Sequence, residues 1–158
     1  MKELYLIRHA EADSPLGLPD FDRPLSANGR AAAENLARTQ AKVLVNAEAV
    51  YASAAIRTMQ TAQIVAQTAG LWAEVQSERF MYMAQSEQIL DWLSAQADDL
   101  GTVLIVGHNP TMYEVARHLG VRIPGFPKAG MVAMRFNTKH WADIGPENRV
   151  AERISFAP

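Results

Sequence analysis

The chain of 158 residues contains no cysteine. Disulfide bonds, thiolate metal ligands and a cysteine nucleophile are therefore excluded. Positive and negative charges are nearly balanced, because 15 Lys and Arg residues and 17 Asp and Glu residues leave a net charge of −2. This balance offers no general attraction to nucleic acid or to an anionic membrane. Any anion-binding site must be a local cluster of basic side chains.

Long apolar runs are missing as well. The first apolar run, residues 4–7, is far shorter than the core of a signal peptide, and no stretch reaches the length of a membrane-spanning helix. A Gly-x-x-x-x-Gly-Lys phosphate loop is also absent, which argues against hydrolysis of nucleoside triphosphates. We therefore expect a cytoplasmic protein without a membrane partner, and the length predicts a single domain over residues 1–158.

Strand and helix patterns alternate along the chain. Strands are predicted at short apolar or alternating runs, and helices where apolar side chains recur at helical spacing. The predicted strands are 4–7, 49–52, 103–106, 131–136 and 150–156, and the predicted helices are 29–44, 53–69, 86–97 and 110–119. The Pro- and Gly-containing segments 12–24 and 122–130 are predicted loops. This order favours an α/β fold whose mainly parallel sheet is covered by helices on both faces.

Basic side chains follow three of the predicted strands. Arg8 and His9 follow the first, Arg57 comes four residues after Ser53 at the end of the second, and His108 follows the third. Because ligands bind at the carboxyl ends of the strands in open α/β sheets, these side chains are expected to meet at one edge. The sequence thus predicts an anion cradle that contains two histidines.

Two helix starts lie near the same edge. Ser53 is predicted to cap the helix that carries Arg57 one turn later, and Asn109 with Pro110 form a matched cap and first residue for the next helix. Free N–H groups at such helix starts favour a bound phosphate. Taken alone, each motif also fits an ordinary helix start or a solvated arginine. The three motifs together at strand ends favour the anion site.

Imidazole chemistry on phosphorus suits this set of residues. None of the four histidines forms a His-x-x-x-His or His-Glu-x-x-His pair, and neighbouring arginines would repel a cation, so neither a metal nor a cofactor is expected. A neutral imidazole can act as the nucleophile when a backbone carbonyl holds its other ring nitrogen. Arginines stabilise the phosphoryl oxygens and keep that imidazole uncharged.

Three blocks of the sequence, 4–10, 53–61 and 106–110, together resemble the histidine phosphatase superfamily, the group with phosphoglycerate mutases and acid phosphatases. The small size and segment 23–29 (Arg-Pro-Leu-Ser-Ala-Asn-Gly) are similar to its short SixA-like branch, the protein phosphohistidine phosphatases. The resemblance implies a phosphoglycerate mutase-like three-layer α/β/α sandwich. It also implies a catalytic set of His9 as nucleophile with Arg8, Arg57 and His108 around the phosphate.

Further residues are assigned to substrate binding. In the SixA-like branch an arginine placed like Arg23 reaches the phosphate, while the alternative is a loop salt bridge of Arg23 with Asp20 or Asp22. Ser53 and Asn109 are predicted to bind substrate because they flank the cradle. Lys128, in the loop 122–130, either approaches the substrate or is solvated.

The sequence departs from the family pattern at Ala10, Ala54 and Thr58, and its general acid is uncertain. The superfamily's Arg-His-Gly motif reads Arg8-His9-Ala10 here, and an alanine held at positive φ would cost about 1 kcal/mol. Many members also carry a carboxylate acid that protonates the leaving oxygen. Glu78 is the candidate for this general acid, with an exposed strand-end or loop glutamate as the alternative; Glu74 is weaker.

The uncertain acid affects the choice of substrate. An alkoxide leaving group needs a proton, whereas the imidazole released from phosphohistidine departs without a strong acid. The first hypothesis is therefore a phosphatase that acts on a phosphorylated partner protein such as a histidine-containing phosphotransfer domain. The second is a small-molecule phosphomonoesterase for sugar or nucleotide phosphate esters. The third is a non-catalytic phosphate-binding module.

Overall fold

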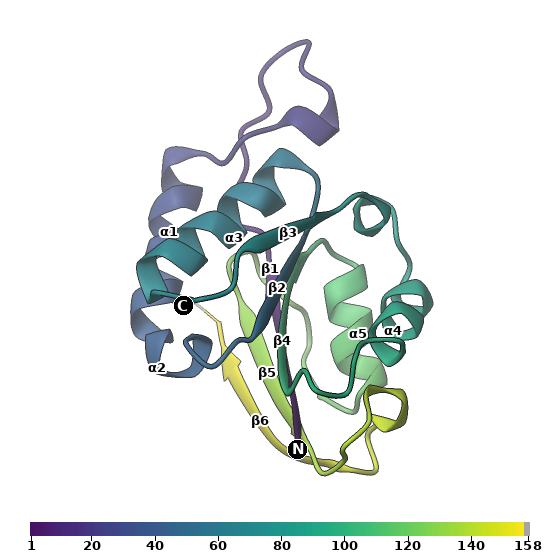
Figure 1. Ribbon diagram of the computed structural model, residues 1–158. Helices are drawn as coiled ribbons and strands as arrows, with labels where there is room; N and C mark the ends of the chain where they lie inside the picture. The colour runs from purple at the N-terminus through teal and green to yellow at the C-terminus, as the bar shows by residue number, and fades with distance from the viewer. Residues whose placement is uncertain (157–158) are drawn as a thin grey trace.

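Six strands form one sheet in the computed structural model, which describes residues 1–156 (Figure 1). The strands are β1 (Lys2–Arg8), β2 (Ala49–Ser53), β3 (Val75–Glu78), β4 (Thr102–Gly107), β5 (Met131–Phe136) and β6 (Arg149–Ser155). Their order across the sheet is β3-β2-β4-β1-β5-β6. The first four strands in this order pair in parallel, and β5 pairs antiparallel with both of its neighbours, β1 and β6. The mainly parallel sheet predicted from the sequence is confirmed.

Helices cover both faces of the sheet. The helices are α1 (Ala27–Thr39), α2 (Ala41–Leu44), α3 (Ile56–Ala69), α4 (Ser86–Ser94) and α5 (Thr111–His118), with short 3-10 helices η1 (Asp20–Asp22), η2 (Arg79–Tyr82) and η3 (Trp141–Asp143). Helices α1 to α3 pack on one face and α4 with α5 on the other (Figure 1). Successive side chains of a strand point to opposite faces, so Tyr5 and Ile7 join the first layer while Leu4 and Leu6 join the second. This is the predicted three-layer α/β/α sandwich.

Three local predictions differ from the structure. Strand β3 was not predicted, because its half-exposed sequence at the sheet edge lacks an apolar run. The single helix predicted over 29–44 is two helices divided at Gln40, and α1 starts earlier because Ser26 Oγ accepts a hydrogen bond of 3.0 Å from Gly29 N. Helix α4 ends at Ser94 rather than at residue 97.

The parallel strands bring three chain segments to one edge. In the register of β1 against β4, the last residues of the two strands, Arg8 and Gly107, are paired. The residue that follows each strand is a histidine. The backbone N–H of His9 donates to Gly107 O at 3.0 Å and continues the ladder for one more bond. Strand β2 ends at the same edge with Ser53.

The segment that follows His9 is held against α1. A Cβ at Gly29 would lie 2.0 Å from Glu11 O, so only glycine permits this approach of the helix to the backbone. The backbone N–H of Ser26 donates to the same Glu11 carbonyl at 2.9 Å. Segment 23–29 thus packs directly behind the His9 turn. No helix in the described part of the chain combines the length and apolarity needed to cross a membrane.

Candidate active site

His9 is buried at the end of β1 with one ring nitrogen already engaged. Its Nδ1 lies 2.7 Å from Ala10 O. A carbonyl only accepts, so Nδ1 carries the proton and donates, and Nε2 is left with a free lone pair. The backbone carbonyl expected to orient this ring is therefore present.

A buried threonine links this turn to α3. Thr61 Oγ1 accepts from Ala10 N at 3.1 Å and donates to Arg57 O at 2.7 Å. The backbone beside His9 and the helix that carries Arg57 are thus joined through one hydroxyl. Sequence reasoning missed Thr61, although its position one helical turn after Arg57 places both on the same face of the helix.

His108 lies next to His9, with 5.3 Å between the ring centroids. Its Nδ1 is 3.5 Å from Arg57 Nη2, and its Nε2 is 2.7 Å from Ser53 Oγ. A guanidinium can only donate, so Nδ1 of His108 accepts and Nε2 carries the proton toward Ser53. The described contacts fix His108 in one neutral tautomer.

The structure contradicts the predicted cap at Ser53. Helix α3 begins at Ile56, with Ala55 at the cap position and no side-chain cap bond, and Arg57 is its second residue rather than one turn in. The Ser53 hydroxyl instead lies against His108, a residue 55 positions away. A hydroxyl at the end of a strand can bond either to the start of the following helix or to a group on a neighbouring strand. For Ser53 the closer partner is His108, which follows strand β4.

The predicted pair of Asn109 as cap and Pro110 as first helical residue is also wrong. Helix α5 begins at Thr111 and Pro110 occupies the cap position. The Asn109 side chain accepts from Tyr113 N at 3.3 Å and donates to Phe126 O at 2.9 Å. It therefore ties the first turn of α5 to the loop 122–130.

Arg8 shares the acceptor that Asn109 uses. Arg8 Nη1 donates to Phe126 O at 3.0 Å, while the buried Nε has no hydrogen-bond partner among the described residues. Burial lowers the pKa of Arg8 from its ordinary value. This guanidinium retains unused hydrogen-bonding capacity beside the two histidines.

Asp20 connects two arginines at the rim of the site. Its carboxylate accepts from Arg23 Nη1 and Arg57 Nη2, each at 3.0 Å, and from the Tyr82 hydroxyl at 2.5 Å. These hydrogen bonds, led by that of Tyr82, hold the pKa of the Asp20 carboxyl well below its usual range. The salt bridge considered for Arg23 is present, with Asp20, while its substrate-binding role stays a prediction. The contacts of Asp20 with Arg57 and Tyr82 were not foreseen.

Both histidines are electrically neutral at neutral pH. Burial, together with the positive charges of Arg57, Arg8 and Lys128, lowers the pKa of His9 to about 4 against the opposing effect of the hydrogen bond to Ala10 O. Burial, followed by the neighbouring His9 and Arg57, lowers the pKa of His108 to about 3. Burial is thus the main reason that both imidazoles are uncharged, and the arginines, which the sequence predicted as the cause for His9, add to it.

These pKa shifts predict how stability depends on pH. The unfolded chain binds a proton on His9 below pH 6.5, and the folded protein does so only near pH 4. The free energy of unfolding should therefore fall as pH drops from about 6.5 to about 4, with His9 contributing on the order of 3 kcal/mol. Urea denaturation of the wild type and of His9→Asn across this range measures the contribution. Parallel curves for the two proteins would contradict it.

Ala10 carries no backbone strain. Among the described residues, the only non-glycine residue at positive φ is Ala129, at 57°, whereas Ala10 is fully buried in ordinary backbone geometry. The cost considered for alanine at this place in the Arg-His-Gly motif does not arise.

Glu78 is the last residue of β3 and so lies at the carboxyl ends of the parallel strands, where the cradle lies. It pairs with Ser53 in the register of β2 against β3, and Glu78 O accepts from Ala54 N at 3.3 Å. In the described structure its carboxylate makes no hydrogen bond or ion pair. The role of Glu78 as general acid stays a prediction.

A groove of about 530 Å³ opens beside His108. Its lining includes Tyr82, Met83, Asn109 and Thr111, and Met83 is 80% exposed. Within the described residues, no group of three His, Asp or Glu side chains is placed to hold a metal ion. His108 is the member of the predicted catalytic set that lines this groove.

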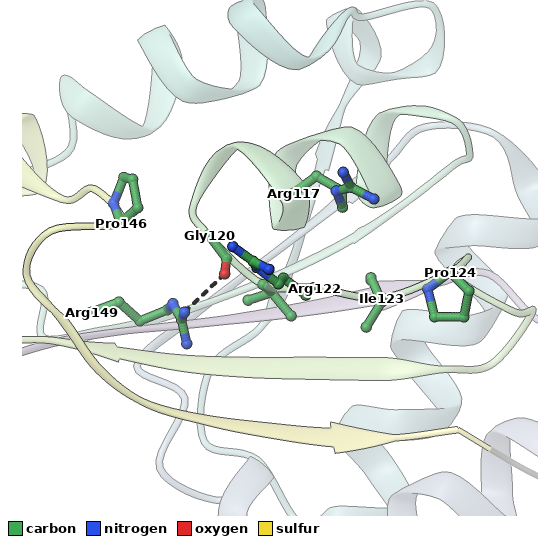
Figure 2. Close-up of a pocket in the computed structure, with 8 residues that line it drawn as sticks. Arg117, Gly120, Arg122, Ile123, Pro124, Pro146 and Arg149 are labelled. Carbon is green, nitrogen blue, oxygen red and sulfur yellow. Dashed lines mark hydrogen bonds between the residues drawn. The ribbon is translucent and has the colours of Figure 1, made fainter.

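A second cavity, of about 810 Å³, lies at the other end of α5 (Figure 2). Arg117, Arg122 and Arg149 line it. Arg149 donates to the carbonyls of Leu119 (3.1 Å) and Gly120 (2.9 Å) and so satisfies the end of the helix. None of the predicted site residues lines this cavity.

The chain is similar to known proteins both in sequence and in structure. The sequence model of the histidine phosphatase superfamily (branch 1) matches residues 4–81. An uncharacterized protein of Mycobacterium tuberculosis is 31% identical over 152 residues, which cover 89% of this chain and 92% of the relative. The "putative phosphohistidine phosphatase SixA" of Agrobacterium tumefaciens superposes with a TM-score of 0.77 at 31% identity, over 85% of this chain and 92% of that one. The protein of the same name from Nakamurella multipartitia has a TM-score of 0.82 at 26% identity, over 99% and 97%.

Proposed function

The chain belongs to the histidine phosphatase superfamily, in its SixA-like branch, and from this membership we propose that it removes phosphate from phosphohistidine on a partner protein. The Agrobacterium relative, whose name refers to phosphohistidine, supports this substrate class. The proposal assigns the nucleophile to His9 and the phosphate cradle to Arg8, Arg57 and His108. It also places the reaction in the cytoplasm.

The first step is attack of His9 Nε2 on phosphorus. The lone pair of Nε2 is available because Nδ1 donates to Ala10 O. A bond forms between phosphorus and Nε2, and the phosphorus–nitrogen bond of the substrate breaks, with its electron pair leaving on the substrate imidazole. Arg8 and Arg57 stabilise the charge on the non-bridging oxygens.

The second step is hydrolysis of the phosphohistidine on His9. A water oxygen bonds to phosphorus, the bond from phosphorus to Nε2 breaks, and the electron pair returns to the ring. The water proton leaves with the phosphate or passes to solvent. Burial keeps His108 neutral, so no positive ring of His108 lies beside His9 during either step.

The phosphohistidine assignment rests on one observation: the carboxyl group that contacts the cradle is held in its ionised form. Asp20 is the acidic residue that contacts the cradle, and its pKa is held below its usual range by Tyr82, Arg23 and Arg57. A carboxylate in this state is a poor proton donor, so Asp20 would not supply the proton that an alkoxide leaving group needs. An imidazole departs without one.

The open groove beside His108 supports a protein partner. A groove of about 530 Å³ has room for a substrate side chain together with part of its backbone. The neighbouring side chain of Met83 is exposed, as expected of a surface that another protein can contact. A phosphohistidine at the surface of a phosphotransfer domain can enter from this side.

The experiment is a substrate comparison on the purified protein. A phosphorylated histidine-containing phosphotransfer domain is expected to be turned over with a kcat/KM at least about 100-fold above those of sugar and nucleotide phosphates, the range that a general acid usually supplies. Higher kcat/KM values for the esters would overturn the proposal, and slower ester hydrolysis by Glu78→Gln would then identify the acid. Glu74→Gln is the matched control.

A further inference from the structure

Asp20 occupies the groups that a phosphate would need. Arg57 Nη1 donates to Asp20 O at 2.7 Å and Arg57 Nη2 to Asp20 Oδ2 at 3.0 Å, so both terminal nitrogens are engaged. The other carboxylate oxygen, Oδ1, accepts from Arg23 Nη1. Two oxygens of one anion, each on a different arginine, reproduce the way in which arginines hold a phosphoryl group.

We propose that Asp20 is an internal competitor for the phosphate cradle, which the substrate's phosphoryl group must displace from Arg57 and Arg23. The inference rests on the proposed function in so far as Arg57 receives the phosphoryl group, and on the predicted substrate-binding role of Arg23. A carboxylate and a phosphoryl dianion repel each other at such short range, so Arg57 cannot serve both at full strength. Segment 12–24, which carries Asp20, then closes the empty cradle and opens on binding.

The segment is built to be displaced at low cost. The 3-10 helix η1 that holds Asp20 contains no buried residue, and its cap position makes no side-chain hydrogen bond. Segment 12–24 projects from the body of the molecule at the edge where the site lies (Figure 1). The Asp20 side chain is 51% exposed, so water can solvate its carboxylate when the segment moves away from the buried Arg57.

Tyr82 completes the closed arrangement. Its hydroxyl donates to Asp20 Oδ2, and its ring packs edge-on against His108, with 5.7 Å between centroids. The Tyr82 ring also packs edge-on against the ring of Phe21, the neighbour of Asp20, with 4.9 Å between the ring centroids. Because Tyr82 also lines the groove beside His108, substrate that enters the groove meets the group that helps to hold the segment closed.

The test compares Asp20→Asn with Asp22→Asn. Both variants change the net charge equally within η1, but Asp22 makes no side-chain contact with Arg57 or Arg23 in the described structure. Titration with inorganic phosphate in a calorimeter is expected to show about tenfold tighter binding for Asp20→Asn than for Asp22→Asn, because the competing state is weakened. Tyr82→Phe should shift the affinity in the same direction by a smaller factor.

A second measurement follows the segment itself. Saturating phosphate should speed amide hydrogen exchange at Asp22 and Arg23, whose N–H groups donate to Pro19 O and Asp20 O in the closed arrangement. With the partner-protein substrate, Asp20→Asn should lower KM and leave kcat nearly unchanged.

Weaker phosphate binding by Asp20→Asn than by Asp22→Asn would instead show that Asp20 positions the arginines for the substrate. Equal phosphate affinities of the two variants would show that only the change in net charge matters. Either result overturns the inference. The proposed function is judged separately. If phosphohistidine is not hydrolysed but Asp20→Asn still binds phosphate more tightly, the function fails and the competition stands.

Discussion

Replacing His9 by alanine is expected to lower kcat for the phosphohistidine substrate by roughly 10⁴- to 10⁶-fold, the scale at which loss of a nucleophile disables an enzyme. The Nε2 lone pair that attacks phosphorus is lost, and no other described ring nitrogen at the site is free to replace it. Both nitrogens of His108 are engaged, by Arg57 and by Ser53. The remaining rate reflects binding by the arginines alone.

The measurement pairs turnover with a chemical trap. Wild-type protein quenched during turnover should carry acid-labile phosphate on His9, and the alanine variant should carry none. His118→Ala is the control, because this exposed histidine at the end of α5 lies outside the cradle. Thermal melting confirms that both variants fold. Phosphoenzyme on the His9 variant would move the nucleophile to another residue.

Replacing Arg57 by alanine is expected to lower kcat/KM by about 10²- to 10³-fold, as for the loss of one preorganised donor at a developing charge. Arg57 is buried, and its Nη2 also donates to His108 Nδ1. Its removal therefore takes away a phosphoryl contact and the bond that selects the tautomer of His108. Lysine should restore little, because an ammonium cannot reproduce the planar fork of the guanidinium.

Two comparisons isolate this effect. Arg38→Lys alters an exposed arginine of α1 that pairs with Glu34, and it should leave kcat/KM unchanged. The double variant Arg57→Ala with Asp20→Asn removes both partners of the ion pair and tests whether an unpaired Asp20 contributes to the loss. An Arg57→Lys protein with wild-type activity would contradict the expected role of the guanidinium.

The sequence predicted the architecture because strands and helices follow local periodicity. The apolar runs of β1, β2 and β4 are buried on both faces, and such strands are recognisable without knowledge of their neighbours. Strand β3 escaped prediction because an edge strand with a half-exposed sequence lacks this signal. Its pairing with β2 depends on a contact partner that the local sequence does not name.

Helix starts were the weakest local predictions. Ser53 and Asn109 both satisfy the composition rule for a cap, yet Ser53 bonds to His108, and Asn109 divides its hydrogen bonds between Tyr113 N and Phe126 O from outside the cap position. The cap rule compares only neighbours in the chain, whereas a side chain bonds to whichever partner the fold brings closest. The substrate-binding roles of Ser53, Asn109 and Arg23 remain predictions of the sequence.

The sequence by itself determined that His9, Arg8, Arg57 and His108 would gather, because parallel strands of one sheet deliver their following residues to one edge. Only the tertiary structure decided what each of them does there. It assigned the proton of His9 to Nδ1, fixed the tautomer of His108 and placed Asp20 on Arg57 and Arg23. The contacts of Asp20 with Arg57 and Tyr82 span 37 and 62 positions of the chain. Separations of that size leave no local pattern, so the carboxylate in the cradle becomes visible only when the chain is folded.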